Sequence, residues 1–209
     1  MFPKSLIDGH HRFRSGRLEH ERERYQELAE SGQRPEVMII GCCDSRAGPE
    51  TIFDSSPGEI FVVRNVANLV PPYEPDGEYH GTSAALEFAV QALKVKHIVV
   101  LGHGRCGGIA ASLSEATEPL SPGDFIGKWI TLIAPAKDRA ESEAYSHHHA
   151  QGRMERASIA NSIDNLRTFP CVKILEERGK LTLHGAWFDI SEGALEILDK
   201  ETGRFDRLP

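Results

Sequence analysis

The sequence has no long hydrophobic run. Its 209 residues contain no apolar stretch near the roughly 20 residues that a helix needs to span a bilayer. The first 17 residues carry basic side chains but no apolar segment of the kind found in signal peptides. We therefore expect a cytoplasmic protein without a membrane partner.

The chain also lacks an excess of positive charge and a framework of cysteines. Lys and Arg number 24 against 31 Asp and Glu, and the net charge of -7 argues against nucleic acid as a partner. Only four cysteines are present, two of them adjacent. A disulfide scaffold is therefore not expected, and thiols kept reduced in the cytoplasm are available to bind metal.

Two regions differ in composition. Residues 4–33 are highly charged with a thin apolar stripe at helical spacing, which predicts one or two amphipathic helices. The pattern leaves open whether this arm packs on its own domain or on another subunit. We divide the chain into an N-terminal helical arm, residues 1–34, and a single α/β domain, residues 35–209.

The larger region alternates short apolar runs with amphipathic segments. Apolar runs at residues 37–41, 60–64 and 97–102 predict buried strands, and residues 81–95 predict a helix before the last of them. This order predicts a mostly parallel central sheet flanked by helices on both faces. Three further expectations concern the C-terminal half: helices at 125–134 and 154–166, strands at 181–190 and 194–198, and pairing of these two strands as an edge hairpin.

Two motifs with metal-binding side chains directly follow predicted strands. Residues 42–46 read Cys-Cys-Asp-Ser-Arg, and residues 103–106 read His-Gly-Arg-Cys. Parallel strands end at the same edge of a sheet, so the two motifs should meet there. Thiolates and imidazole suit zinc, and we find no obvious fourth soft ligand. The motifs therefore predict a catalytic zinc site with one position left to water.

The spacing within each motif restricts the ligands further. An extended chain sends Cys42 and Cys43 to opposite sides, so only one of the two can bind the metal. His103 and Cys106 are three residues apart, which places both on one face at the start of a helix, and the surrounding glycines permit a tight turn. The cysteine that does not bind the metal, like Cys171, is expected to be a buried packing residue.

Asp44 and Arg46 supply the charges that zinc chemistry needs. Zinc lowers the pKa of a bound water enough to supply hydroxide near neutral pH. The Asp44 carboxylate would accept a hydrogen bond from that hydroxide and so orient it. Arg46 would hold Asp44 in place by a forked ion pair.

The motifs resemble Cys-x-Asp-x-Arg and His-x-x-Cys of the beta-class carbonic anhydrases. Residues 57–72, 81–87 and 184–188 are also similar to that family, and the resemblance covers about residues 33–190. It implies the reversible hydration of carbon dioxide to bicarbonate and a proton by a zinc-bound hydroxide. It also implies Cys42, His103 and Cys106 as the zinc ligands, and a homo-oligomer, either a dimer or a dimer of dimers, with active sites near the subunit interface.

The resemblance is to the plant-like branch of the family with an open metal site. In that branch Gln33 would hydrogen-bond the substrate, and Phe61 and Val66 would line an apolar slot. Phe88 stands where plant-like members often carry a tyrosine in the pocket, and Gly107 completes the expected pocket.

The chain departs from the branch of the family that is inhibited by bicarbonate. There a Trp, an Arg and a Tyr hold a non-catalytic bicarbonate, and the aligned residues here are Ile39, Arg64 and Phe188. Only the arginine is retained, so we expect no inhibitory site. We also expect Asp44 to stay paired with Arg46 instead of binding zinc.

The same residues allow other interpretations. The metal site could hydrolyse carbonyl sulfide or carbon disulfide, or could serve a zinc-dependent sensor without turnover. A structural zinc site is disfavoured by the missing fourth ligand, and a phosphate-binding turn by the missing Walker lysine. The three histidines at residues 147–149 are expected on a solvated surface, and His184 is expected to be packed and hydrogen-bonded.

Overall fold

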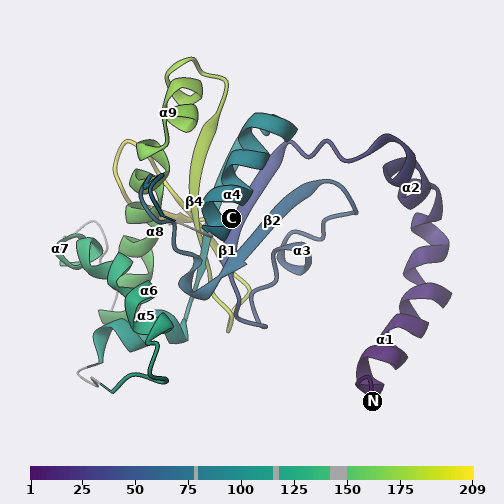
Figure 1. The fold of residues 1–209 in the computed structure, drawn as a ribbon, viewed down its shortest axis with the longest axis horizontal. Helices are drawn as coiled ribbons and strands as arrows, with labels where there is room; N and C mark the ends of the chain where they lie inside the picture. Colours follow the sequence, from purple (N-terminus) through teal and green to yellow (C-terminus); the bar gives the residue numbers. More distant parts are fainter. Residues whose placement is uncertain (78–79, 115–117, 142–149) are drawn as a thin grey trace.

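The computed structural model describes residues 1–77, 80–114, 118–141 and 150–209 (Figure 1). Its sheet has six strands in the order β2-β1-β3-β4-β5-β6. The first four pair in parallel, whereas β5 pairs antiparallel with β4 and β6 pairs antiparallel with β5. The expected mostly parallel sheet is therefore present. Its strands are β1 (Val37–Cys42), β2 (Ile60–Asn65), β3 (His97–His103), β4 (Thr182–Phe188), β5 (Leu195–Leu198) and β6 (Phe205–Arg207).

The expected C-terminal hairpin forms between β4 and β5, but it does not end the sheet. The short strand β6 pairs with β5 and lies at the edge. A strand of three residues is too short to show the alternation that identifies strands in a sequence.

The helices lie close to the predicted segments, with two differences. The segment at 81–95 is an α-helix that continues as a π-helical turn, and a helix that begins at Pro170 follows the long helix of the domain. Pro at the first helical position explains this break, because its missing N–H would be unpaired there anyway. The helical segments are α1 (Lys4–Ser15), α2 (Arg17–Ser31), α3 (Pro49–Ile52), η1 (Val66–Asn68), α4 (Gly81–Glu87), η2 (Phe88–Leu93), α5 (Gly107–Leu113), α6 (Phe125–Ile130), η3 (Thr131–Ala136), α7 (Lys137–Ala140), α8 (Ala150–Thr168) and α9 (Pro170–Glu177).

The main core lies between one face of the sheet and helices α4, α8 and α9. Met38, Ile98 and Leu183 are fully buried there against side chains of these helices. Helix α8 approaches the sheet closely over two glycines. A Cβ atom at Gly102 would lie 2.6 Å from the Ile159 side chain, and one at Gly185 would lie 2.9 Å from it.

We expect helices on both faces of the sheet, but the opposite face is mostly not covered by the described helices. Ile39, Leu101 and Ala186 are buried there, but the neighbouring side chains on the strands are only partly buried. Among the described residues, the only helical side chain in this apolar cluster is Ile52 of α3. Most of the second face is thus formed by strand residues alone.

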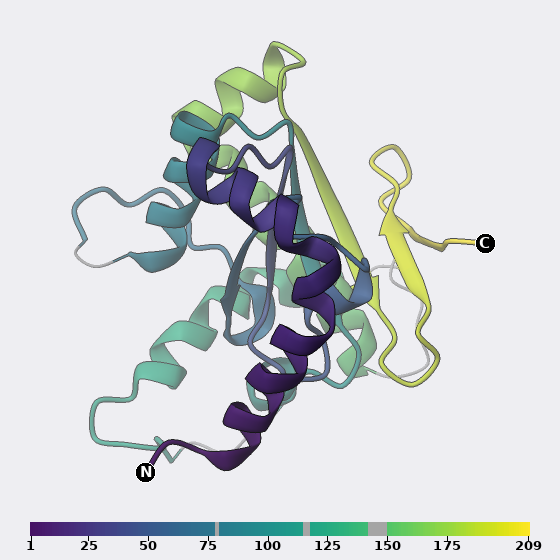
Figure 2. The ribbon, with the colours of Figure 1, turned by 90° about the vertical axis from the view of Figure 1, so that its right-hand side faces the viewer.

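The N-terminal helices stand apart from the sheet in Figure 1, and in Figure 2 they lie in front of it. Helix α2 contacts the loop before β2, where Arg24 Nε donates to the Pro57 carbonyl over 3.3 Å and Leu28 packs on Gly58. Helix α1 buries none of its residues, and Leu6 and Ile7 are exposed. Part of the arm therefore packs on its own chain, while α1 presents apolar side chains outward. The division at residue 34 stays a prediction.

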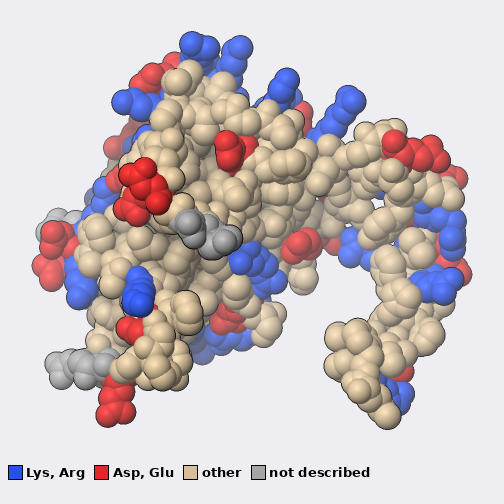
Figure 3. All heavy atoms as spheres, in the orientation of Figure 1, with Lys and Arg blue, Asp and Glu red and all other residues tan. Residues whose placement is uncertain are grey.

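Charges of both signs are distributed over the face shown in Figure 3. Lys and Arg lie interspersed with Asp and Glu on the arm and on the body of the molecule. No helix within residues 1–77, 80–114, 118–141 and 150–209 is long and apolar enough to cross a membrane.

Candidate metal centre

Three buried ligand atoms meet at the carboxyl ends of β1 and β3. Cys42 ends β1, His103 ends β3, and Cys106 immediately precedes α5. Their ligand atoms all lie within 4.8 Å of one another, and the two sulfurs are 3.9 Å apart. A tetrahedral zinc ion with bonds of about 2.3 Å to sulfur requires a separation of about 3.8 Å. The observed group therefore fits zinc.

His103 is prepared to bind a metal through Nε2. Its Nδ1 lies 2.9 Å from the Gly104 carbonyl oxygen, which can only accept, so Nδ1 carries the proton. Nε2 then presents a lone pair, and it is buried without a hydrogen-bond partner among the described residues. A buried imidazole nitrogen left unpaired is costly, and a metal ion would satisfy it.

The Cys42 and Cys106 thiols contact each other, so the ionisation of one disfavours that of the other. The hydrogen bond from Cys106 lowers the pKa of Cys42 to about 4, and the same contact raises the pKa of Cys106, because a second thiolate beside the first is disfavoured. A divalent cation between the sulfurs would offset this repulsion and bind both as thiolates.

The turn between His103 and Cys106 differs from the expected start of a helix. His103 still belongs to the strand, and the left-handed backbone conformation that reverses the chain is at Arg105, with a φ of 57°, not at a glycine. The glycines permit close packing instead. A Cβ atom at Gly104 would lie 3.0 Å from Trp187, and one at Gly108 would lie 2.9 Å from Val66.

Asp44 and Arg46 form the expected forked pair. Arg46 Nε and one terminal nitrogen donate to the two Asp44 oxygens over 2.9 and 2.7 Å, and the Arg46 backbone N–H adds a third bond of 3.0 Å. These bonds hold the pKa of Asp44 well below its usual range. The carboxylate lies beside the ligand group, with Oδ2 3.9 Å from His103 Nε2.

Arg64 holds the backbone of the same segment. Its Nε donates to the Cys42 carbonyl and its terminal nitrogen to the Asp44 carbonyl, both over 2.7 Å. Ile39 is buried in the sheet, and Phe188 is partly buried. Arg64 is thus engaged by peptide oxygens, which is a role that the sequence pattern does not indicate.

The cysteines outside the ligand group are not both buried. Cys43 is exposed, because it lies just after the end of β1, where the chain leaves the sheet. The expectation that it is a buried packing residue is wrong. Cys171, in α9, is partly buried against the main core.

The expected pocket residues fall into two groups. Val66 and Gly107 lie near Cys106, since Val66 contacts Gly108 and Gly107 begins α5. Phe61 precedes Asn65, the strand partner of Cys42, by four residues, or about 13 Å along β2. Its ring contacts Phe88 at 5.9 Å between centroids, so this pair lies away from the ligand group of its own chain.

Three further expectations concern residues outside the ligand group. Gln33 is exposed in the link between α2 and β1. His184 is hydrogen-bonded as expected, with its Nε2 3.2 Å from His97 Nδ1. The histidines at residues 147–149 lie outside the described residues.

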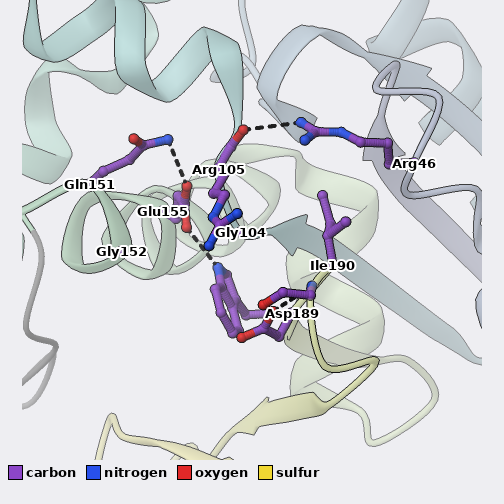
Figure 4. Close-up of a pocket in the computed structure, with 10 residues that line it drawn as sticks. Arg46, Gly104, Arg105, Gln151, Gly152, Glu155, Asp189 and Ile190 are labelled. Carbon is purple, nitrogen blue, oxygen red and sulfur yellow. Dashed lines mark hydrogen bonds between the residues drawn. The ribbon is translucent and has the colours of Figure 1, made fainter.

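A cavity of about 410 Å³ lies beside the ligand group (Figure 4). Arg46, Arg105 and Asp189 line it together with Gln151 and the buried carboxylate of Glu155. The last two come from α8, which the sequence motifs do not connect with the metal site.

Comparisons with known proteins agree with this geometry. A sequence model of the family described as carbonic anhydrase matches residues 37–195. Beta carbonic anhydrase 5, chloroplastic, of Arabidopsis thaliana is 39% identical over 176 residues, which are 83% of this chain but 57% of that relative. A carbonic anhydrase of Pseudomonas aeruginosa is 37% identical over 205 residues, which are 97% of this chain and 90% of that relative. The chain thus spans less than two thirds of the Arabidopsis protein.

Solved structures show the same fold. The beta-carbonic anhydrase CcaA matches with a TM-score of 0.85 and 29% identity, covering 99% of this chain and 92% of that one. One of two tetrameric beta-carbonic anhydrases of Sordaria macrospora matches with a TM-score of 0.76 and 32% identity, covering 93% and 95%. The residues matched by the family model include strands β1 to β4 and the group Cys42, His103 and Cys106. The chain therefore belongs to the beta-class carbonic anhydrases.

Proposed function

We propose that this protein catalyses the reversible hydration of carbon dioxide to bicarbonate and a proton, with zinc held by Cys42, His103 and Cys106. The observation that carries the proposal is the buried group of three ligands beside the forked Asp44–Arg46 pair. When bound, zinc lowers the pKa of a water in its open position and so supplies the nucleophile near neutral pH.

Asp44 orients the attacking water. An ionised carboxylate only accepts hydrogen bonds, so it selects the water orientation whose hydrogen points at Asp44 and whose lone pair is free for carbon. Arg46 keeps the carboxylate ionised and fixed through two bonds. Arg64 restrains the peptide carbonyls on either side of Cys43, which limits movement of the Asp44 backbone.

The substrate pocket is proposed to combine two chains. Val66 and Gly107 flank Cys106 in the same chain and would form one wall. Gln33, Phe61 and Phe88 are remote from their own ligand group and would line the site of a second copy. A homo-oligomer, a dimer or a dimer of dimers, is supported by the sparsely covered sheet face and the exposed apolar residues of α1. The cytoplasmic location stays a prediction.

Stopped-flow measurement of carbon dioxide hydration tests the proposal. The zinc-loaded protein should show fast turnover, and Cys106→Ser should lose both metal and activity, because a serine hydroxyl is a poor zinc ligand. Cys171→Ser is the matched control, since Cys171 lies in α9 outside the centre, and it should retain both. Equal rates for the Cys106 variant and the parent protein would refute the assignment.

Parallel assays separate the other reactions. Carbonyl sulfide and carbon disulfide should be turned over more slowly than carbon dioxide if hydration is the main activity. A zinc-loaded protein that accelerates none of these reactions over buffer would instead be a zinc-dependent sensor.

A further inference from the structure

Glu155 is a buried carboxylate that the proposed chemistry does not use. It lies on α8 and is 3% exposed. A charge removed from water to this extent is strongly unfavourable unless hydrogen bonds replace its hydration. The contacts of its two oxygens therefore indicate why a carboxylate is present at this position.

Three N–H groups point at the two oxygens of Glu155. Oε1 accepts from the Cys106 backbone N–H over 3.0 Å and from Gln151 Nε2 over 3.1 Å. Oε2 accepts from the Trp187 indole N–H over 3.0 Å. All three partners are donors, so the site suits a group that only accepts, which is an ionised carboxylate. Figure 4 shows Glu155 and Gln151 among the residues that line the cavity, with a dashed line for the hydrogen bond between them.

Gln151, one turn earlier on α8, binds the peptide unit that follows Cys106. Its Nε2 also donates to the Cys106 carbonyl over 3.1 Å. Glu155 and Gln151 together therefore contact both the N–H and the carbonyl of Cys106. This residue follows the left-handed turn at Arg105 and precedes α5, so neither a strand nor a helix supplies a partner for its N–H.

We propose that Glu155, assisted by Gln151, is a positioning residue for the zinc ligand Cys106. It fixes the Cys106 peptide so that the sulfur stays 3.9 Å from that of Cys42, which is the separation that tetrahedral zinc requires. The inference rests on the proposed zinc site but not on turnover. A protein that binds zinc without hydrating carbon dioxide would still test it.

The ion pair of the next residue on α8 offers a matched control. Arg156 is also buried and forms an ion pair with Glu196 over 2.8 Å. Its guanidinium carbon lies 3.7 Å from the centroid of the Trp187 ring, which also donates to Glu155. Among the described residues, the Glu196 carboxylate binds Arg156 and not the Cys106 loop, so it supports α8 and Trp187 only. Glu196→Gln weakens an ionic contact of the same helix, made by a partly buried carboxylate, without touching a zinc ligand.

Glu155→Gln is the decisive substitution. The Cys106 and Trp187 N–H groups are fixed in the backbone and in a buried ring, one at each oxygen. Whichever way the introduced amide turns, its NH₂ group faces one of these donors. The introduced side chain therefore cannot keep both contacts in place, and the restraint on the Cys106 peptide should weaken, whereas the volume of the side chain is unchanged.

Zinc affinity is measured by competition with a chelator, well below the unfolding temperature of each variant. We expect Glu155→Gln to weaken zinc binding by about 10- to 100-fold, the usual effect of losing a partner of a metal ligand. Glu196→Gln should lower the unfolding temperature but keep the affinity. The thiolate-to-metal absorption band of the cobalt-substituted protein should shift in the first variant and not in the second.

Equal zinc affinities and cobalt spectra for the two variants would overturn the proposal and leave Glu155 a stabilising residue only. If Glu155→Gln does not fold, Gln151→Ala decides, because Gln151 is only partly buried and its loss removes the bond to the Cys106 carbonyl. Unchanged zinc affinity in Gln151→Ala would then contradict the inference. Loss of carbon dioxide hydration with normal zinc affinity would bear on the proposed function instead.

Discussion

At the scale of single residues, the forked pair beside the ligand group carries the chemistry. Asp44→Asn replaces one acceptor oxygen by a donor, so Arg46 loses one of its two bonds and the reacting water loses its orienting carboxylate. We expect hydration to fall at least about tenfold, with the zinc content unchanged. Stopped-flow rates and metal analysis of the same samples check both parts.

Asp189→Asn is the control for this substitution. Asp189 lines the neighbouring cavity, and its carboxylate accepts hydrogen bonds from Ser191. Asp189 thus carries a negative charge near the ligand group, but its carboxylate does not contact that group. A comparable loss in both variants would show that general charge, and not the forked contact, matters.

The ligands could be recognised in the sequence, whereas the residues that support them could not. Cys42, His103 and Cys106 follow apolar runs at spacings that suit zinc, so chemistry and local pattern agree. Glu155 lies 49 positions after Cys106, and nothing near it in the sequence marks it as a partner of the metal loop. Arg64 is likewise a surface-type residue whose two carbonyl partners only the folded chain identifies.

At the scale of secondary-structure elements, the close approach of α8 to the sheet depends on glycine. Gly102→Ala would place a Cβ atom 2.6 Å from Ile159 Cδ1, which forces the helix or the side chain to move. We expect the free energy of unfolding in urea to fall by about 1–3 kcal/mol. Adding Ile159→Val, which removes Cδ1, should recover part of the loss.

Gly81→Ala, at the first residue of helix α4, is the matched control for this substitution in strand β3. A Cβ atom at Gly81 has no neighbour within 4 Å, so the same chemical change should leave the stability of the protein intact. If Gly102→Ala is as stable as this control, the packing argument is wrong.

The β3–β4 pair should respond to acid through His184. Burial, together with the positive charge of Lys200 and the neighbouring His97, lowers the pKa of His184. In the unfolded chain His184 takes up a proton at an ordinary pKa of about 6.5. Its contribution to the free energy of unfolding is therefore complete above that pH and is lost as the pH falls below it. When the pH is lowered from about 7.5 to about 5, the free energy of unfolding in urea should fall less in His184→Gln than in the parent protein.

The exposed His10 on α1 provides the comparison for His184. His10→Gln should leave the pH dependence of unfolding as it is in the parent protein, because the side chain is exposed on a helix that buries no residue. Identical pH profiles for the parent and the His184 variant would exclude a contribution from the strand pair.

At the scale of the whole molecule, one sheet face predicts association, because among the described residues only Ile52 of α3 covers its apolar cluster from a helix. Val62 lies partly buried on that face, and Val62→Lys should place a charge in the interface between copies. We expect sedimentation to show a homo-oligomer for the parent chain and smaller species for this variant, with circular dichroism unchanged. Ile174→Lys, at an exposed apolar position on α9, is the control and should keep the parent mass.

The hydration of carbon dioxide should depend on formation of the homo-oligomer if two chains form the pocket. The Val62 variant should keep its zinc, because the ligand group is buried within one chain, but lose hydration as it dissociates. Full activity in a monomeric species would contradict the proposed contribution of Gln33, Phe61 and Phe88 from a second copy.

The sequence by itself determined the parallel strands, the ligand residues and the forked pair, because apolar runs, zinc-binding side chains and an Asp-x-Arg spacing are local properties. The tertiary structure alone decided what surrounds them. It assigned the chain reversal to Arg105, exposed Cys43, left one sheet face mostly without helices, and brought Glu155 from α8 to the Cys106 peptide. Such contacts join residues far apart in the chain, and only the packing of helix on sheet sets which of them meet.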